Sequence, residues 1–116
     1  MSLLARVLEE PGEEVSIAAV EGEVDASNAG EVGDRLRTAM TNRSTTLVVD
    51  LSGTRYIDSA GINMLFELAG ELDHRQQRMR LVVPASSPIA RMLAIAGLDA
   101  VVPVHETRAE ALEQQP

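Results

Sequence analysis

One serine stands where a helix would accommodate a phosphoryl group. The run Ile57-Asp58-Ser59-Ala60-Gly61 follows an apolar strand and a loop and leads into an amphipathic helix. A helix N-terminus presents unpaired backbone N–H groups and the positive end of the helix dipole, and both favour a negative charge. A serine there is most simply an N-cap. Because Asp58 lies beside the hydroxyl and Gly61 permits close approach of a backbone or a phosphate, Ser59 is also a candidate phosphorylation site.

Asp50 is a second candidate, since a carboxylate at the end of a central apolar strand is the phosphoacceptor in receiver domains of two-component systems. That function also needs an acidic pair after the first strand, to hold a divalent cation, and a lysine after the last strand. The chain contains no lysine. We therefore interpret Asp50 as a strand-end carboxylate that caps the following turn.

The two histidines give little support to catalysis or metal binding. His74 falls at the polar C-terminal end of a predicted helix, where an imidazolium suits the dipole. His105 follows the last predicted strand and has no serine, aspartate or second histidine at a motif spacing. We expect both to be solvated surface residues. Without cysteine or a cluster of His, Asp and Glu, we expect no metal and no other cofactor.

Composition narrows the remaining functions. Ten basic residues, all of them arginine, stand against 18 acidic residues, and the formal net charge is −8. Such a field repels polyanions, so we expect no nucleic-acid partner. The absence of lysine removes Schiff-base and P-loop chemistry, and we expect no enzyme.

The 116 residues fit one domain, predicted over 1–113 with a frayed tail at 114–116. No export signal or membrane span is evident, which favours a cytoplasmic protein without membrane contact.

The hydropathy pattern alternates strands with helices. Strands are predicted at 3–8, 15–24, 47–51, 80–83 and 101–104. Helices are predicted to begin at Asn28, to span 60–75, and to begin again at Ser87-Pro88 and at Thr107. The first and last carry candidate capping boxes, Asn28 with Glu31 and Thr107 with Glu110. The order β-β-α-β-α-β-α-β-α predicts an α/β fold, a mixed and mostly parallel sheet with about four helices packed on it.

The second helix has more apolar residues than one stripe uses. Its inner stripe is predicted to be Ile62, Leu65, Phe66, Ala69 and Leu72. Met64 and Leu68 lie off that stripe, four residues apart, and are expected on the outward face. Because they begin about one turn beyond Ser59, we interpret them as candidate contacts for a partner protein.

The segment around Ser59 resembles the signature of STAS domains, specifically of bacterial anti-sigma-factor antagonists (anti-anti-sigma factors). The matching residues are Asp50-Leu51-Ser52-Gly53 and Ile57-Asp58-Ser59-Ala60-Gly61. The resemblance continues at Gly22-Glu23-Val24-Asp25, Leu81-Val82-Val83-Pro84, Ile95-Ala96-Gly97-Leu98-Asp99 and 106–112. It therefore spans nearly the whole chain in order and implies the STAS fold. Ala60 stands where the family often has a second serine, while Ser59 stays aligned with the phosphoacceptor.

This resemblance implies a switch in which the protein is substrate and ligand. The unphosphorylated form would bind an anti-sigma factor that is also a Ser/Thr kinase and so free the sigma factor. Phosphorylation of Ser59 would end binding, and a PPM-type phosphatase would restore it. Asp25, at the end of the second strand, either orients Ser59 for phosphoryl transfer or caps the loop before the first helix. We expect a monomer, and little global change on phosphorylation.

A second function stays open. STAS domains also serve as adaptor subunits of lipid-transport or stress-sensing complexes without a phospho-switch. A serine or threonine near the position of Ser59 can persist in lipid-transport partners, so the motif does not separate the two roles. Co-purification would discriminate between the two roles: an antagonist would bind a small ATPase-like kinase, and an adaptor of lipid transport would bind a membrane permease.

Overall fold

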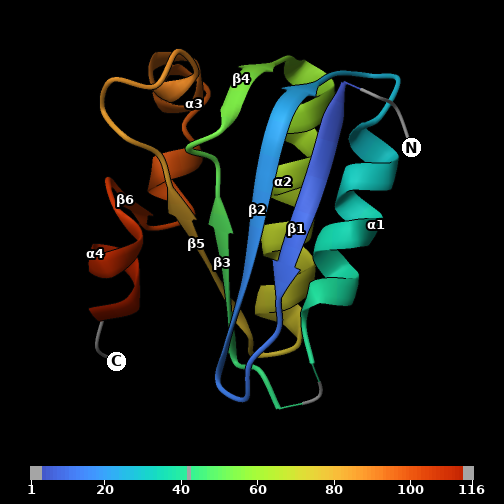
Figure 1. The fold of residues 1–116 in the computed structure, drawn as a ribbon, viewed down its shortest axis with the longest axis vertical. Coiled ribbons are helices and arrows are strands. Elements are labelled where there is room, and N and C mark those ends of the chain that lie inside the picture. Colours follow the sequence, from blue (N-terminus) through green and yellow to red (C-terminus); the bar gives the residue numbers. More distant parts are fainter. Residues whose placement is uncertain (1–3, 42, 114–116) are drawn as a thin grey trace.

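The longest strand, β2 (Val15–Val24), organises a six-stranded sheet. The computed structural model of the chain describes residues 4–41 and 43–113. The other strands are β1 (Ala5–Glu10), β3 (Thr46–Asp50), β4 (Thr54–Ile57), β5 (Arg78–Val82) and β6 (Val104–His105). Their order is β1-β2-β3-β5-β6, with β4 paired to β2 (Figure 1). Among the strands of the described residues, only the β1–β2 pair is antiparallel, so the predicted hairpin and the mostly parallel sheet are confirmed.

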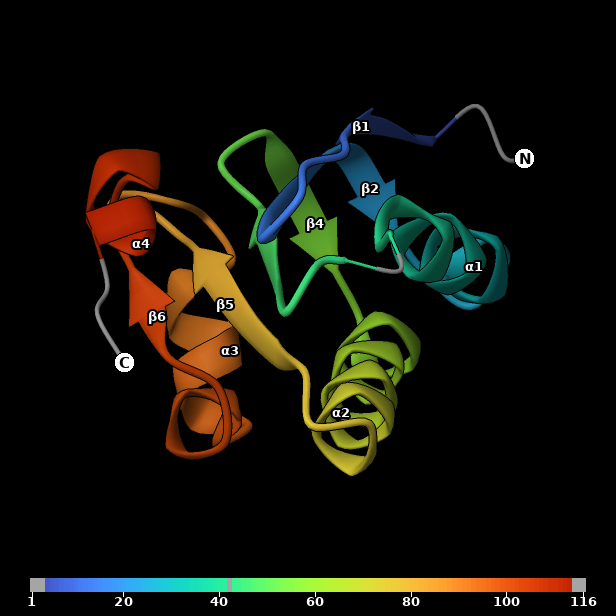
Figure 2. The same cartoon turned by 90° about the horizontal axis from the view of Figure 1, so that it is seen from below.

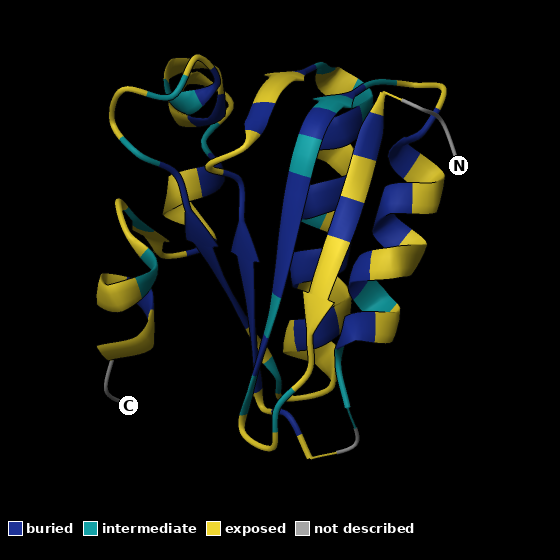
Figure 3. Ribbon diagram, viewed as in Figure 1, coloured by how far each residue is buried: buried dark blue, intermediate teal, exposed yellow. Residues whose placement is uncertain are grey.

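The helices cover the two faces of the sheet unequally. The first three, α1 (Ala29–Ala39), α2 (Ser59–His74) and α3 (Ala90–Ile95), lie on one face, and α4 (Arg108–Glu113) lies on the other (Figure 2). A short 3₁₀ helix, η1 (Leu98–Ala100), follows α3. The main core lies between the sheet and the first three helices, whereas a small cluster of Val48, Val82 and Ala111 lies beneath α4. Strand β3 is buried along its whole length, as its continuous apolar sequence predicts (Figure 3).

The strand β4 was not predicted from the sequence. The bounds of β2 are those predicted, and its first five residues pair with β3. Because β2 continues beyond the end of β3, its last residues, Gly22 to Val24, are open on that side and pair with β4 instead. Only Thr54 and Ile57 of β4 are buried, and the Thr54 hydroxyl donates to the Val20 carbonyl at 2.7 Å.

Several helix and strand ends differ from the prediction. The first predicted strand began at Leu3, which lies outside the described residues, as does the predicted tail at 114–116. Helix α3 begins later than Ser87-Pro88, and its Met92 is exposed where an apolar face was expected. The turn after α3 is confirmed, because Gly97 has φ +83° and Leu98 is buried. At α4, Thr107 Oγ1 accepts from the backbone nitrogen of Glu110 at 3.1 Å, which confirms the threonine half of the predicted capping box. The Glu110 carboxylate accepts from the backbone nitrogen of Glu106 at 3.0 Å, one residue before the position that a capping box uses.

Among the described residues, no helix combines the length and the apolar character that a membrane crossing requires.

Candidate functional site

Ser59 is exposed and is the first residue of α2. The parallel pairing of β2 with β4 ends at Val24 and Ile57, and the backbone nitrogen of Asp58 still donates to the Val24 carbonyl at 3.1 Å. The loops that follow the two strands are therefore neighbours. One loop leads to α1 and the other leads to α2. Both helices begin at this end of the sheet (Figure 1). The N-termini of α1 and α2 therefore lie at the same end of the sheet, and Ser59 is at the N-terminus of α2.

The cap of α2 is Asp58 rather than Ser59, which corrects the prediction by one residue. The Asp58 carboxylate accepts from the backbone nitrogens of Ala60 at 2.9 Å and Gly61 at 3.2 Å. The two N–H groups expected to receive a phosphate are therefore already bonded. The physical reason is that Asp caps as well as Ser, and here the carboxylate stands one position earlier, where its oxygen reaches both amides. The Ser59 hydroxyl is left at the surface.

Gly61 is required for packing inside the fold. A Cβ built on Gly61 would lie 2.5 Å from Ile57 Cγ1 and 2.9 Å from Val24 Cγ1. The sequence suggested that Gly61 allows a backbone or a phosphate to come close. In the structure, two core side chains come close to it instead. This contact presses the first turn of α2 onto the paired ends of β2 and β4. It determines how far Ser59 stands from the sheet, and Ala60 is half-buried beside it.

Asp25 caps the loop between β2 and α1. Its carboxylate accepts from the backbone nitrogen of Ser27 at 2.8 Å and from the Ser27 hydroxyl. These two hydrogen bonds, the one from the hydroxyl foremost, hold the pKa of Asp25 below its ordinary value. Of the two roles considered for Asp25, the loop cap is therefore observed. An orienting role toward Ser59 stays a proposal.

Asn28 holds the same loop in a way that the sequence did not reveal. The predicted capping box with Glu31 is not formed by its side chain, which makes no cap hydrogen bond to α1. Instead the buried Asn28 amide accepts from the backbone nitrogen of Asp25 at 2.9 Å and donates to the Glu23 carbonyl at 2.9 Å. From sequence alone, an asparagine before a helix is equally compatible with a helix cap and with hydrogen bonds inside the preceding loop. Only the structure shows that Asn28 makes the loop hydrogen bonds.

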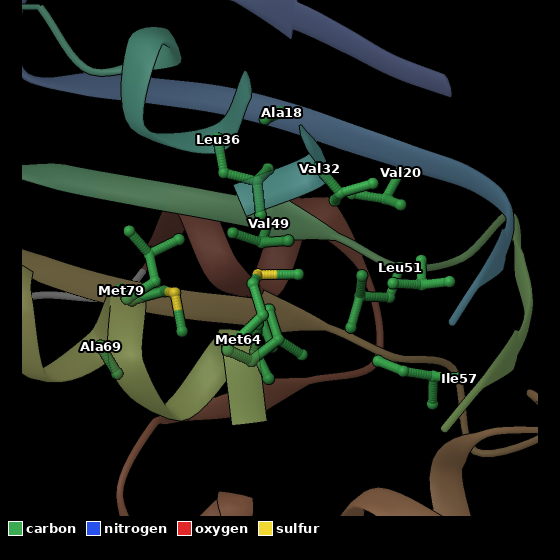
Figure 4. Close-up of a cluster of buried hydrophobic side chains, with 14 of the residues drawn as sticks. Ala18, Val20, Val32, Leu36, Val49, Leu51, Ile57, Met64, Ala69 and Met79 are labelled. Carbon is green, nitrogen blue, oxygen red and sulfur yellow. The ribbon is translucent and has the colours of Figure 1, made fainter. Parts of the chain in front are cut away.

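Met64 and Leu68 are buried, and the expectation that both face outward is wrong. Their exposed fractions are 7% and 0%, and both belong to the main core. Helix α2 packs against α1 as well as against the sheet, so its apolar face is wider than one stripe. Figure 4 shows Met64 in the same cluster as Leu36 of α1 and Val49 of β3. Leu68 is closed to a partner, and Met64 is covered except where it lines a shallow hollow between α1 and α2.

The remaining candidates are Asp50 and the two histidines, and only Asp50 has a clear structural role. The Asp50 carboxylate accepts from the Ser52 backbone nitrogen at 2.9 Å, which confirms the predicted turn cap, and from Arg108 Nε at 2.6 Å. His74 is exposed, as expected. His105 is half-buried, and its Nε2 is enclosed without a hydrogen-bond partner among the described residues, so the expectation of a solvated histidine is wrong there.

Comparison with known families identifies the domain. A family model described as "Mlab, STAS domain" matches residues 7–103. The chain belongs to this STAS-domain family. The matched segment runs from β1 to the approach to β6 and includes Ser59 with both neighbouring loops.

Solved structures of similar fold include anti-sigma factor antagonists. One from Mycobacterium paratuberculosis has 25% identity and a TM-score of 0.77, over 94% of this chain and 92% of that one. A putative one from Thermotoga maritima has 21% identity and a TM-score of 0.80, over 92% of each chain. The antagonist SpoIIAA in its unphosphorylated form has 20% identity and a TM-score of 0.73, over 93% of this chain and 94% of that one. The Bacillus SpoIIAA is also similar in its phosphorylated form, with a TM-score of 0.68.

The same STAS fold also occurs within a transporter. The murine anion transporter Slc26a9 has 18% identity and a TM-score of 0.74, over 88% of this chain but only 18% of that one. The fold by itself therefore does not decide the role, and the argument for function has to come from the site.

Proposed function

We propose that this STAS domain is an anti-sigma-factor antagonist regulated by phosphorylation of Ser59. The unphosphorylated form binds an anti-sigma factor with serine kinase activity and so releases the sigma factor in the cytoplasm. The observation that carries the proposal is the exposed hydroxyl of Ser59 on the first residue of α2. Similarity to the mycobacterial antagonist, and to SpoIIAA in unphosphorylated and phosphorylated forms, supports it.

The electrostatics around Ser59 suit an off-switch that acts locally. Phosphorylation adds about −1.5 to −2 charges. Asp58 is the adjacent residue and already holds the amides of Ala60 and Gly61, so a phosphate gains no hydrogen bond from them unless it displaces that carboxylate. The new charge stays at the surface, and a partner that covers Ser59 has to desolvate it. A loss of about 2.7 kcal/mol already weakens binding a hundredfold.

In this role the protein is a substrate and a ligand and performs no chemistry itself. The kinase brings the γ-phosphate of ATP to the Ser59 hydroxyl, and a PPM-type phosphatase removes the phosphate later. Asp25 orients Ser59 for phosphoryl transfer, and Asp58 holds the first turn of α2, on which the serine stands. We propose that the protein acts as a monomer, because one face carries the switch.

Intact-mass spectrometry tests the phosphorylation. The wild type is incubated with ATP and each candidate anti-sigma kinase of the same organism, beside Ser59→Ala and Ser86→Ala. Ser86 is a matched control because it is also an exposed serine, in the loop after β5. We expect one phosphate on the wild type and on Ser86→Ala, and none on Ser59→Ala. A phosphate on Ser59→Ala, or none on the wild type, contradicts the proposed site.

Titration with the same anti-sigma factor tests the switch. We expect Ser59→Asp to bind at least tenfold more weakly than the wild type, and Ser59→Ala to bind as the wild type does. Equal binding by all three would leave an adaptor without a phospho-switch.

A further inference from the structure

A groove runs between α1 and α2 from the neighbourhood of Ser59. This α1–α2 groove has a volume of about 240 Å³ and is lined by Ala29, Gly30 and Arg37 of α1 and by Ala60, Asn63, Met64 and Glu67 of α2. Asn63 follows Ser59 by four residues and Glu67 follows Asn63 by four, so the three share one side of α2. The groove is therefore continuous with the surface that carries the candidate phosphorylation site.

Glycines give the groove its shape. A Cβ on Gly33 would lie 2.9 Å from Met64 Cγ, so this glycine lets Met64 fill the base of the contact between the helices. A Cβ on Gly30 would meet nothing within 4 Å, so the wall of the groove is low at that point. At the far end, Arg37 Nε and Nη2 donate to the two carboxylate oxygens of Glu71 at 2.7 and 2.8 Å. That ion pair links the two helices and closes the groove.

The charged residues that line the groove are Arg37 and Glu67, and two further carboxylates, Asp34 and Glu71, pair with Arg37. The Arg37 guanidinium is engaged by Glu71 and, at 3.2 Å, by Asp34, and the hydrogen bond to Glu71 is the main cause that raises the pKa of Arg37. Glu67 is exposed and makes no hydrogen bond or ion pair with the described part of the chain, although its charge also contributes to the raised pKa of Arg37. Its carboxylate thus lines the groove without a bonded cation of this protein, beside the apolar surface of Met64 and Ala60.

We propose that the α1–α2 groove receives a segment of the anti-sigma factor that carries an arginine or lysine next to a small apolar side chain. The basic group pairs with Glu67, and the apolar side chain contacts Ala60 and the small part of Met64 that lines the groove. This proposal rests on the proposed function and names the surface that its partner uses. Charge complementarity carries it, because the three carboxylates of Asp34, Glu67 and Glu71 surround one guanidinium, that of Arg37, and a basic segment matches this excess of negative charge.

The basic contact and the phospho-switch act at different places on α2. Eight residues separate Ser59 from Glu67, which is about 12 Å along a helix. A kinase brings the phosphates of ATP to Ser59, so the bound nucleotide places negative charge over the serine. A phosphate on Ser59 meets that like charge, while the basic segment lies two turns away at Glu67. Phosphorylation of Ser59 can therefore weaken the complex even though the basic segment is attracted to the acidic surface around Glu67.

A matched pair of glycine variants tests the groove. Gly30→Gln places a side chain in the groove, whereas Gly70→Gln places the same side chain on α2 outside it. Both glycines are exposed helix residues, and an added Cβ has open space at both. Because glycine is a poor helix former, both variants are expected to fold at least as stably as the wild type. Circular dichroism and urea unfolding check this.

The readout is the affinity for the anti-sigma factor used in the phosphorylation assay. We expect Gly30→Gln to bind at least tenfold more weakly and Gly70→Gln to bind as the wild type does. Glu67→Gln is expected to weaken binding about threefold to tenfold and to reduce its dependence on salt. Wild-type affinity for Gly30→Gln and Glu67→Gln overturns the groove, even if Ser59→Asp loses binding and the switch is upheld. If Ser59→Asp binds normally while Gly30→Gln does not, the switch is overturned and the groove is upheld. Binding of the wild type to none of the candidate anti-sigma factors overturns both.

Discussion

The Asp58 carboxylate lies 2.9 Å from the backbone nitrogen of Ala60 and thereby closes the first turn of α2. The same oxygen accepts from Gly61 at 3.2 Å, so one side chain satisfies two of the amides that a helix start leaves unpaired. Asp58 is also joined to β2 through the Val24 carbonyl. The residue before Ser59 therefore fixes the serine relative to both the helix and the sheet.

Loss of this cap should destabilise the fold. We expect Asp58→Ala to lower the free energy of unfolding by about 1 kcal/mol, the usual cost of an N-cap, and Asp58→Asn to lower it by much less. Urea unfolding at neutral pH measures both. Equal stability of the alanine variant and the wild type would show that the two hydrogen bonds are replaced by water without cost.

The pair of Asp50 and Arg108 should make stability depend on pH. Burial raises the pKa of Asp50, but the hydrogen bonds from Ser52 and Arg108 outweigh it, and the net pKa lies below the ordinary value. The ionised form is thus favoured in the fold. Its contribution is present above the unfolded pKa of about 3.9 and is lost as pH falls through the lowered native value. We expect Asp50→Asn to cost about 1–2 kcal/mol at pH 7 and much less near pH 2.

A surface ion pair supplies the control for that experiment. Glu13 pairs with Arg43, and both side chains are about three-quarters exposed. Glu13→Gln is expected to change the free energy of unfolding by less than about 0.5 kcal/mol at either pH, because exposed pairs contribute little. If the difference between Asp50→Asn and the wild type were the same at pH 7 and near pH 2, the proposed linkage to Asp50 would be wrong.

The prediction from sequence was most accurate where a segment carries its own pattern. Strands β2 and β3 are apolar over most of their length, and α2 repeats its apolar residues at helical spacing, so all three were found. Strand β4 has two exposed residues out of four and exists because β2 is longer than β3. That cause is tertiary and has no local signal.

The candidate site was predicted in position but not in detail. Ser59 stands at the start of α2 as expected, yet Ser and Asp are almost equal caps, so their order in Asp58-Ser59 does not reveal which one closes the helix. The error at Met64 and Leu68 has a similar origin. A helix pattern shows which residues are apolar, but the second neighbour that buries them, here α1, is known only from the fold.

The burial of Leu68 makes a direct prediction about stability. Leu68→Ala should lower the free energy of unfolding by about 2–5 kcal/mol, because it removes a fully buried side chain and leaves a cavity. Leu112→Ala is the matched control, since Leu112 is a helical leucine with an exposed fraction of 45%. It should cost less than about 1 kcal/mol. Thermal unfolding of the two variants compares them, and equal losses would contradict the burial of Leu68.

Gly61 and Gly70 should respond oppositely to the same added methyl group. At Gly61 the new Cβ would lie 2.5 Å from Ile57 Cγ1, so Ile57 or the first turn of α2 has to move, and we expect Gly61→Ala to cost about 1–3 kcal/mol. At Gly70 the Cβ has open space, and the higher helix propensity of alanine should stabilise the protein by up to about 1 kcal/mol. Urea unfolding measures both changes.

The Gly61→Ala variant should also change the rate at which the kinase phosphorylates Ser59, since the displaced turn carries that residue, whereas Gly70→Ala should leave the rate unchanged. Equal phosphorylation of a destabilised Gly61→Ala would show that the position of the first turn does not limit phosphoryl transfer.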